Sequence, residues 1–124
     1  MSCLFCDLKE ETELIIYEND EVYCIYDNYP VTQGHILIIS KKHRVDYFAL
    51  DKKELNAIDE AIRACKSKLD VLFRPSGYNI GVNNGCSAGQ TIMHLHVHLI
   101  PRYDDLSFDP KGGVRGVIPE KQKY

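Results

Sequence analysis

The segment HLHVHLI, residues 94 to 100, places three of the chain's five histidines on alternate positions. Successive side chains of an extended strand point to opposite faces, so His94, His96 and His98 share one face and the leucine and valine residues share the other. Pro101 and Arg102 are expected to end this strand. Three imidazoles need partners if buried and pack poorly if exposed, so the row predicts a functional face.

Three kinds of chemistry are open to such a row. Neutral imidazole near pH 7 is both a nucleophile and a proton carrier, because its ordinary pKa is about 6.5. The row can present a nucleophilic histidine, hold a catalytic metal as His-x-His pairs do, or bind a ligand without reacting. The residues of the row leave these alternatives open.

A second group of metal-ligating residues begins the chain, where Cys3 and Cys6 have the C-x2-C spacing of a zinc knuckle. A tetrahedral site needs two more ligands, and no second C-x2-C pair exists, so His43 and a member of the row are the candidates. Without a metal, the pair is two reduced thiols. Five cysteines fit poorly with a disulfide framework, and Cys24 and Cys65 lie in apolar stretches that predict core positions.

The residue totals limit the class of protein. A chain of 124 residues, 44% of them hydrophobic, suits one domain over residues 1–124, with residues 103–124 as an extended tail. A net charge of -3 without a long basic run argues against a protein that coats nucleic acid. No secretion signal or run of about 18 apolar residues occurs, which predicts a cytoplasmic location and no membrane partner.

The hydrophobic pattern predicts strands on both sides of one long helix. Residues 13–20 and 21–28 form an expected hairpin around Asn19 and Asp20, and residues 35–40 a buried strand. A capping box of Asp51 and Glu54 opens a helix that Arg74 to Gly77 ends. Its apolar stripe consists of Leu55, Ile58, Ile62, Cys65, Leu69 and Leu72.

Between the expected helix and the histidine row, the sequence predicts a further strand and then a loop. Residues 78–83 alternate apolar and polar side chains, which favours a strand with one polar side. The loop at residues 84–91, NGCSAGQT, is rich in small residues and can bring backbone N–H groups close to an anion. The whole pattern predicts an α+β domain with a mostly antiparallel sheet.

The segments GHILIISKKH and NNGCSAGQTIMHLHVHLIPR, with the alternating histidine pattern, resemble the histidine triad (HIT) superfamily of nucleotide hydrolases and transferases up to about Arg102. The resemblance implies a HIT-like α+β fold of about five mostly antiparallel strands, one long helix and a short N-terminal helix. It also implies that His96 attacks the α-phosphorus of a purine nucleoside phosphoramidate or dinucleoside polyphosphate. A covalent nucleotidyl-histidine forms and water cleaves it.

The resemblance further assigns the other site residues. The backbone carbonyl of His94 would hold the ring of His96, His98 would contact phosphate oxygens and His35 would support the row. The expected substrate contacts are Asn83 on the phosphate or ribose side, Gln90 and Thr91 on the phosphoryl oxygens, Asp27 on the ribose hydroxyls, and Phe5, Leu8, Val22 and Ile25 around the base. For Asp27, a simple turn-starting role is the alternative.

The resemblance extends to the metal and to the oligomeric state. Some HIT proteins, and the related galactose-1-phosphate uridylyltransferases, hold a structural zinc, which maps here to Cys3, Cys6, His43 and His94, with no catalytic metal required. A homodimer is expected by analogy, with the long helix and the adjacent strand near the contact and the C-terminal tails crossing toward the partner's pocket. A nucleotide-binding regulator with negligible turnover is the alternative function. Lys111 and Arg115 are either solvated or contact a second polyphosphate arm.

Overall fold

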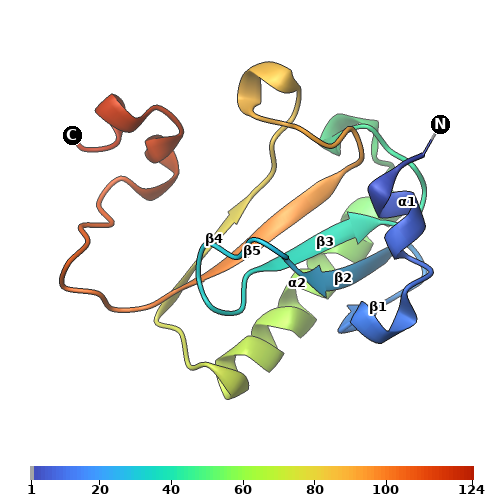
Figure 1. The fold of residues 1–124 in the computed structure, drawn as a ribbon, viewed down its shortest axis with the longest axis horizontal. Helices are drawn as coiled ribbons and strands as arrows, with labels where there is room; N and C mark the ends of the chain where they lie inside the picture. The colour runs from blue at the N-terminus through green and yellow to red at the C-terminus, as the bar shows by residue number, and fades with distance from the viewer. Residues whose placement is uncertain (1) are drawn as a thin grey trace.

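The computed structural model describes residues 2–124 and contains one antiparallel sheet of five strands (Figure 1). The strands are β1 (Tyr17–Glu18), β2 (Val22–Tyr26), β3 (Ile36–Ser40), β4 (Gly77–Gly81) and β5 (His96–Arg102), and they lie in the order β1-β2-β3-β5-β4. The helices are α1 (Leu4–Leu8) and α2 (Lys52–Leu72). The predicted α+β fold, with about five antiparallel strands, one long helix and a short N-terminal helix, is therefore confirmed.

The hairpin of β1 and β2 forms around Asn19, as the sequence predicts. The Asn19 side-chain oxygen accepts hydrogen bonds from the amides of Glu21 and Val22 at 3.1 and 3.0 Å, which closes the turn. β1 has only two residues, because the preceding Thr12–Leu14 segment forms a 3-10 turn. β3 is buried along its whole length, in agreement with its β-branched apolar sequence.

The long helix α2 begins at the predicted capping box. Asp51 accepts from the Glu54 amide at 2.8 Å, and the Glu54 side chain accepts from the Asp51 amide at 3.0 Å. Ile58, Cys65 and Leu69 are buried against the sheet, as expected. Leu72 was expected on the buried stripe but is 60% exposed, because Leu69 and Phe73 pack against the core at this end of the helix instead.

β5 differs from its predicted bounds at both ends. It begins at His96 and not at His94, because the Leu95 amide donates to the Arg44 carbonyl in a loop. It also continues through Pro101, which was expected to end it. Proline fits there because it lies beyond the last β3 pair, Ile36↔Leu99, and its carbonyl accepts from the Thr32 hydroxyl at 2.7 Å.

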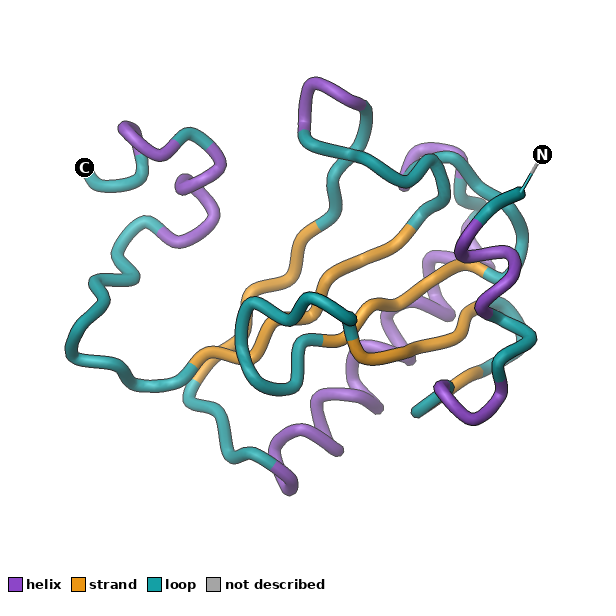
Figure 2. The backbone as a smooth tube through the Cα atoms, in the orientation of Figure 1, coloured by secondary structure: helices purple, strands orange, loops and turns teal. Residues whose placement is uncertain are grey.

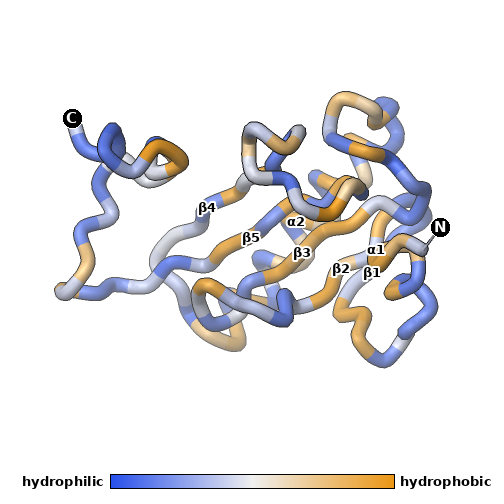
Figure 3. Tube along the Cα trace, turned by 45° about the horizontal axis from the view of Figure 1, so that its top comes forward, coloured by the Kyte–Doolittle hydropathy of each residue, from blue (hydrophilic) through white to orange (hydrophobic). Residues whose placement is uncertain are grey.

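The two faces of the sheet carry separate apolar clusters. Val22, Ile36, Val97 and Leu99 face α2 and form the main core with it. Phe5 of α1 covers the opposite face, where it packs in one cluster with the strand residues Tyr23, Ile25, Leu37 and Ile39. Figure 3 shows the apolar sequence along β2 and β3. His96 and His98 pair with Ile39 and Leu37, so they lie on the α1 face.

The C-terminal tail leaves the sheet after β5 and forms two short 3-10 turns, Gly113–Val117 and Pro119–Lys121, the first of which contacts β4 (Figure 2). Lys111 and Arg115 lie 5.6 and 4.8 Å from the Tyr124 ring, so both cations interact within the tail. No helix in residues 2–124 combines the length and apolar character that crossing a bilayer requires.

Candidate active site and metal centre

The imidazole of His96 is fixed by one backbone hydrogen bond. Its Nδ1 lies 2.8 Å from the carbonyl oxygen of His94. A carbonyl can only accept, so Nδ1 carries the proton and Nε2 of the neutral ring has a free lone pair. The Phe5 ring packs against the imidazole with 4.9 Å between centroids. His96 therefore presents an oriented, unprotonated nitrogen.

His98 has the opposite tautomer, which a chain of two hydrogen bonds determines. The Val31 amide donates to His35 Nδ1 at 3.2 Å, so the neutral His35 ring carries its proton on Nε2. That N–H lies 2.9 Å from His98 Nδ1 and donates to it. The remaining proton of His98 is then on Nε2, where it is available as a hydrogen-bond donor.

Burial lowers the pKa of both His98 and His35 and so favours their neutral rings. The pKa of His98 is lowered to about 4, chiefly by burial and also by the neighbouring His96 and His35. Burial likewise lowers the pKa of His35, and the Asp27 carboxylate opposes that shift from 3.5 Å. At pH 7 His98 is thus a neutral donor and not a cation.

His96 and His98 line a cavity of about 270 Å³ between α1 and the sheet. Of the predicted substrate contacts, the structure places Asp27, Asn83 and Thr91 on its wall. The predicted base-pocket residues on this wall are Phe5, Leu8 and Ile25, and the sequence interpretation missed Leu4, Leu37 and Ile92.

Val22 was wrongly expected in the base pocket. It is fully buried in the cluster that packs on α2, because residues 22 and 24 of β2 point away from Phe5 whereas residues 23 and 25 point toward it. The strand period would have excluded Val22 once Ile25 was placed on the α1 face.

Asp27 both starts a turn and borders the cavity. One carboxylate oxygen accepts from the Tyr29 amide at 2.8 Å, which makes Asp27 the start of a turn. The other oxygen lies 3.5 Å from His35 Nε2, and the residue borders the cavity. The turn therefore places the carboxylate beside the histidines, where it can accept from a ligand hydroxyl.

Gln90 was expected to contact phosphate, but its side chain is used inside the protein. Its Oε1 accepts from the Gly85 amide at 2.8 Å, and its Nε2 donates to the carbonyls of Val45 and Ile92 at 2.6 and 3.1 Å. Only 4% of the residue is exposed, and it does not line the cavity. This geometry makes Gln90 a brace for the loop at residues 84–91.

Cys3, Cys6, His43 and His94 converge as a four-ligand cluster on one side of the histidine row. His94 Nδ1 lies 3.3 and 3.5 Å from the sulfur atoms of Cys3 and Cys6, and His43 Nδ1 lies 3.3 Å from Cys6 and 3.2 Å from His94 Nδ1. Roughly 3.3 to 3.8 Å is the edge of a tetrahedron with Zn–N and Zn–S bonds of about 2.0 to 2.3 Å. These residues therefore fit a tetrahedral Cys2His2 metal.

The tautomer of His94 agrees with metal binding. Its Nε2 donates to the Ser40 carbonyl at 2.7 Å, which leaves the Nδ1 lone pair directed at the cluster. A second convergent group consists of Asp27, His35 and His98. In residues 2–124 His96 belongs to neither group, which counts against a catalytic metal held by the three row histidines.

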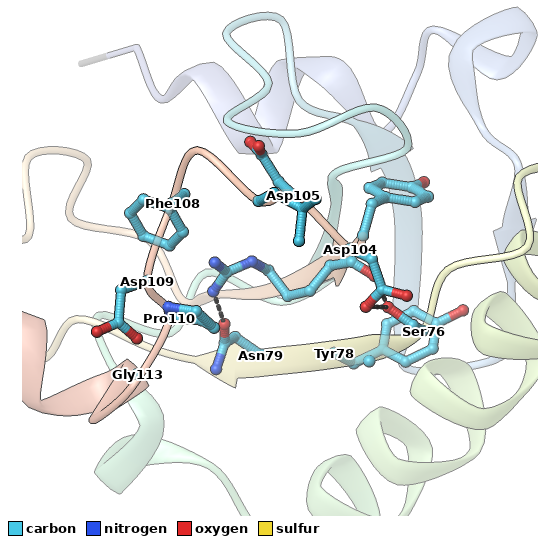
Figure 4. Close-up of a pocket in the computed structure, with 13 residues that line it drawn as sticks. Ser76, Tyr78, Asn79, Asp104, Asp105, Phe108, Asp109, Pro110 and Gly113 are labelled. Atoms are coloured by element: carbon cyan, nitrogen blue, oxygen red, sulfur yellow. Dashed lines mark hydrogen bonds between the residues drawn. The ribbon is translucent and has the colours of Figure 1, made fainter.

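A larger cavity, of about 680 Å³, lies elsewhere, between β4, the end of β5 and the tail (Figure 4). Arg102 donates to the Asn79 side chain at 2.6 Å across it, and Asp104 accepts from Ser76 at 3.2 Å. It contains none of the histidines. We assign the chemistry to the smaller cavity, because only that one brings oriented imidazoles together.

Comparison with known proteins identifies the family. The HIT domain family matches residues 8–105, so this chain belongs to the HIT family. An uncharacterized HIT-like protein of Mycoplasma genitalium is 40% identical over 105 residues, 83% of this chain and 74% of that protein. An AP-4-A phosphorylase of Mycobacterium tuberculosis is 36% identical over 120 residues, 91% of this chain and 59% of that protein.

Further relatives add a named activity and a metal-bound structure. An adenylylsulfatase of Arabidopsis thaliana is 35% identical over 105 residues, 81% of this chain and 52% of that protein. The crystal structure of a Zn-bound histidine triad family protein from Mycobacterium smegmatis superimposes with a TM-score of 0.78 at 29% identity, over 88% of this chain and 81% of that one. A HIT family protein from Bacillus anthracis gives 0.77 at 38% identity, over 84% and 75%.

Proposed function

We propose that the protein hydrolyses or transfers nucleotides by attack of His96 on the α-phosphorus, through a covalent nucleotidyl-histidine. The observation that carries this proposal is the free Nε2 lone pair of His96 at the wall of the 270 Å³ cavity. A P–N bond forms as the bond to the leaving group breaks. Water then attacks the same phosphorus and releases the nucleoside monophosphate and the free imidazole.

The neighbouring groups stabilise the charge that develops on phosphorus. The Nε2–H of His98 donates to the phosphoryl oxygens, and its direction is preset by His35 and Val31. Thr91 and Asn83 extend this polar wall. These donors need little reorganisation during the reaction, because hydrogen bonds within the protein already orient the rings.

The remaining wall of the cavity suits a nucleoside. Phe5, Ile25 and Leu37 form an apolar surface beside His96 on which a purine can pack. The carboxylate of Asp27 lies at the other side of the same cavity and accepts from ribose hydroxyls. The nucleoside would then lie between α1 and Asp27, with its α-phosphate at the histidines.

The tautomer of His98 also bears on the leaving group. A neutral imidazole N–H donates a hydrogen bond but is a poor acid, so a group that departs as a stable anion needs less help than an amine. A phosphate or sulfate leaving group meets this condition. Relatives named AP-4-A phosphorylase and adenylylsulfatase support the same choice. We therefore place dinucleoside polyphosphates ahead of phosphoramidates.

We further propose that the Cys2His2 cluster holds a structural zinc. Four protein ligands fill a tetrahedral site and leave no position for water or substrate. The ion would join α1 to the loop that carries His43 and to His94. It would stabilise the wall of the cavity and would not take part in the reaction, which we place in the cytoplasm.

The covalent intermediate provides the direct test. A diadenosine polyphosphate and an adenosine phosphoramidate, each labelled on the α-phosphate, are mixed with the enzyme and quenched in acid-free denaturant. We expect the label on His96 in peptide mass spectra, with faster formation from the polyphosphate. Steady turnover without any adduct, or label on another residue, would disprove the covalent route through His96.

We also propose a homodimer formed through β4 and the end of α2. β4 is an edge strand, and Ile80, Val71 and Leu72 at this side are 52%, 78% and 60% exposed. The cavity between β4 and the tail borders the same strand (Figure 4). A second copy would cover this edge.

Sedimentation at micromolar concentration tests the dimer. We expect the wild-type chain to sediment as a dimer and Ile80→Asp as a monomer, because a buried unpaired carboxylate costs several kcal/mol. Phe48→Asp is the matched control, since Phe48 is 80% exposed but lies outside β4 and α2. A wild-type monomer, or equal loss of the dimer in both variants, would contradict the proposed interface.

A further inference from the structure

We propose that Glu54 and Arg44, which lie outside the cavity, are positioning residues for His96. The two residues act through the peptide unit between His94 and Leu95. This inference rests on the proposed function in one respect, namely that His96 is the reacting residue. Its structural part concerns only the orientation and the tautomer of that ring.

The peptide unit of residues 94 and 95 has a hydrogen bond at each end. Its carbonyl, from His94, accepts from His96 Nδ1 at 2.8 Å. Its amide, from Leu95, donates to the Arg44 carbonyl at 2.6 Å. The unit is planar, so the bond at the amide end fixes the direction of the carbonyl at the other end. The Arg44 backbone therefore sets the acceptor that holds the His96 ring.

Arg44 is in turn held by a buried carboxylate. Its Nε lies 3.1 and 3.0 Å from the two oxygens of Glu54, whose side chain is 0% exposed. Glu54 occupies the first turn of α2, where the Asp51 amide donates to it at 3.0 Å. The first turn of α2, a helix on the opposite face of the sheet, is thus connected to His96 by an ion pair, one backbone hydrogen bond and the bond from the His96 ring to the His94 carbonyl.

The expected consequence of this connection is control of the tautomer of His96. In a neutral histidine, the nitrogen that faces a hydrogen-bond acceptor carries the proton. In His96 this nitrogen is Nδ1, which faces the His94 carbonyl. If that carbonyl turns away, the ring loses the bond and Nε2 can carry the proton instead. An Nε2–H ring has no lone pair toward the cavity and cannot attack phosphorus.

The test uses Glu54→Gln, which keeps the size of the side chain and removes its charge. Arg44→Lys is the second variant, because it keeps the charge and the backbone but loses the planar guanidinium. Asp59→Asn is the matched control, since Asp59 pairs with Arg63 on the same helix at 64% and 78% side-chain exposure. All are compared as metal-loaded protein with the metal content measured.

The main readout is the ¹⁵N spectrum of histidine-labelled protein without substrate. We expect wild type and Asp59→Asn to show His96 protonated at Nδ1, and Glu54→Gln and Arg44→Lys to show a fraction at Nε2. The Leu95 amide should exchange about tenfold faster in these two variants, as the loss of one hydrogen bond predicts. We expect kcat to fall by about 10- to 100-fold with little change in KM.

The outcomes separate this inference from the proposed function. Folded Glu54→Gln or Arg44→Lys with an unchanged His96 tautomer and unchanged Leu95 exchange would overturn the positioning role. A changed tautomer that returns to normal when lost metal is added back would overturn the direct route through the peptide. A changed tautomer in a protein whose activity survives His96→Ala would refute the proposed function and leave the positioning role standing.

Discussion

Replacing His96 with alanine is expected to lower kcat/KM for a dinucleoside polyphosphate by about 10⁴-fold or more. This corresponds to a loss of about 5.5 kcal/mol of transition-state stabilisation. The reason is that no other imidazole in residues 2–124 presents a free nitrogen lone pair to the cavity. His98 directs a proton there, and His94 directs its lone pair at the cysteines. Steady-state kinetics on both proteins measures the effect.

His98→Ala is the matched control for this substitution, because it removes a donor from the same row without removing the nucleophile. A smaller loss of about 10²- to 10³-fold is expected, as for the removal of one preorganised donor. Affinity for adenosine monophosphate should stay within about threefold in His96→Ala, since the apolar wall remains. Activity of His96→Ala within about tenfold of wild type would contradict the mechanism. Tight nucleotide binding with negligible wild-type turnover would instead favour a regulatory protein.

Substitution of Cys3 and Cys6 by serine is expected to abolish binding of one zinc per chain and to destabilise the fold. The cluster joins Cys3 to His94, 91 positions apart in the chain. Cross-links that close loops of this length contribute about 4 to 5 kcal/mol on the chain-entropy model. The midpoint of thermal unfolding should therefore fall by about 10 to 20 °C. Metal analysis and calorimetry measure the two effects.

Cys86→Ser is the control for the zinc experiment, because Cys86 is exposed and lies outside the cluster. It should retain the zinc and the unfolding temperature. In the double variant KM should rise more than kcat falls, since the proposed metal would stabilise α1, whose Leu4, Phe5 and Leu8 line the cavity. Wild-type protein without bound zinc would exclude the structural site. Activity that tracks zinc content in a fully folded protein would favour a catalytic metal.

Sequence pattern predicts most of this fold, because the buried elements have strong periods. The β-branched run of β3 and the capping box of α2 fall where they were expected. The ends of β5 could not be predicted from its own residues. Its start depends on the bond from Leu95 to Arg44, and its end on the pairing of Pro101 and Arg102 with β4. Both are contacts with distant parts of the chain.

The site shows the same division. The alternation of His94, His96 and His98 predicts a chemical face, but the tautomers depend on Val31, Ser40 and the backbone of residue 94, which have no distinctive sequence signal. For Gln90 the sequence signal was misleading, since a polar residue in a glycine-rich loop was expected to bind phosphate. Its amide is instead satisfied by three backbone groups, which only the folded loop brings together.

Residues 95–99, the start of β5 and the residue before it, alternate between two sides: His96 and His98 face the cavity, and Leu95, Val97 and Leu99 pack in the buried core. Deleting or inserting one residue within 95–99 would exchange the two sets of side chains. Imidazoles would then point into the core against α2, and aliphatic side chains into the cavity. The register of this strand is therefore constrained twice, by the packing of the core and by the proposed chemistry of the cavity. Insertions and deletions are therefore expected to be tolerated in the loops that flank this strand, but not within it.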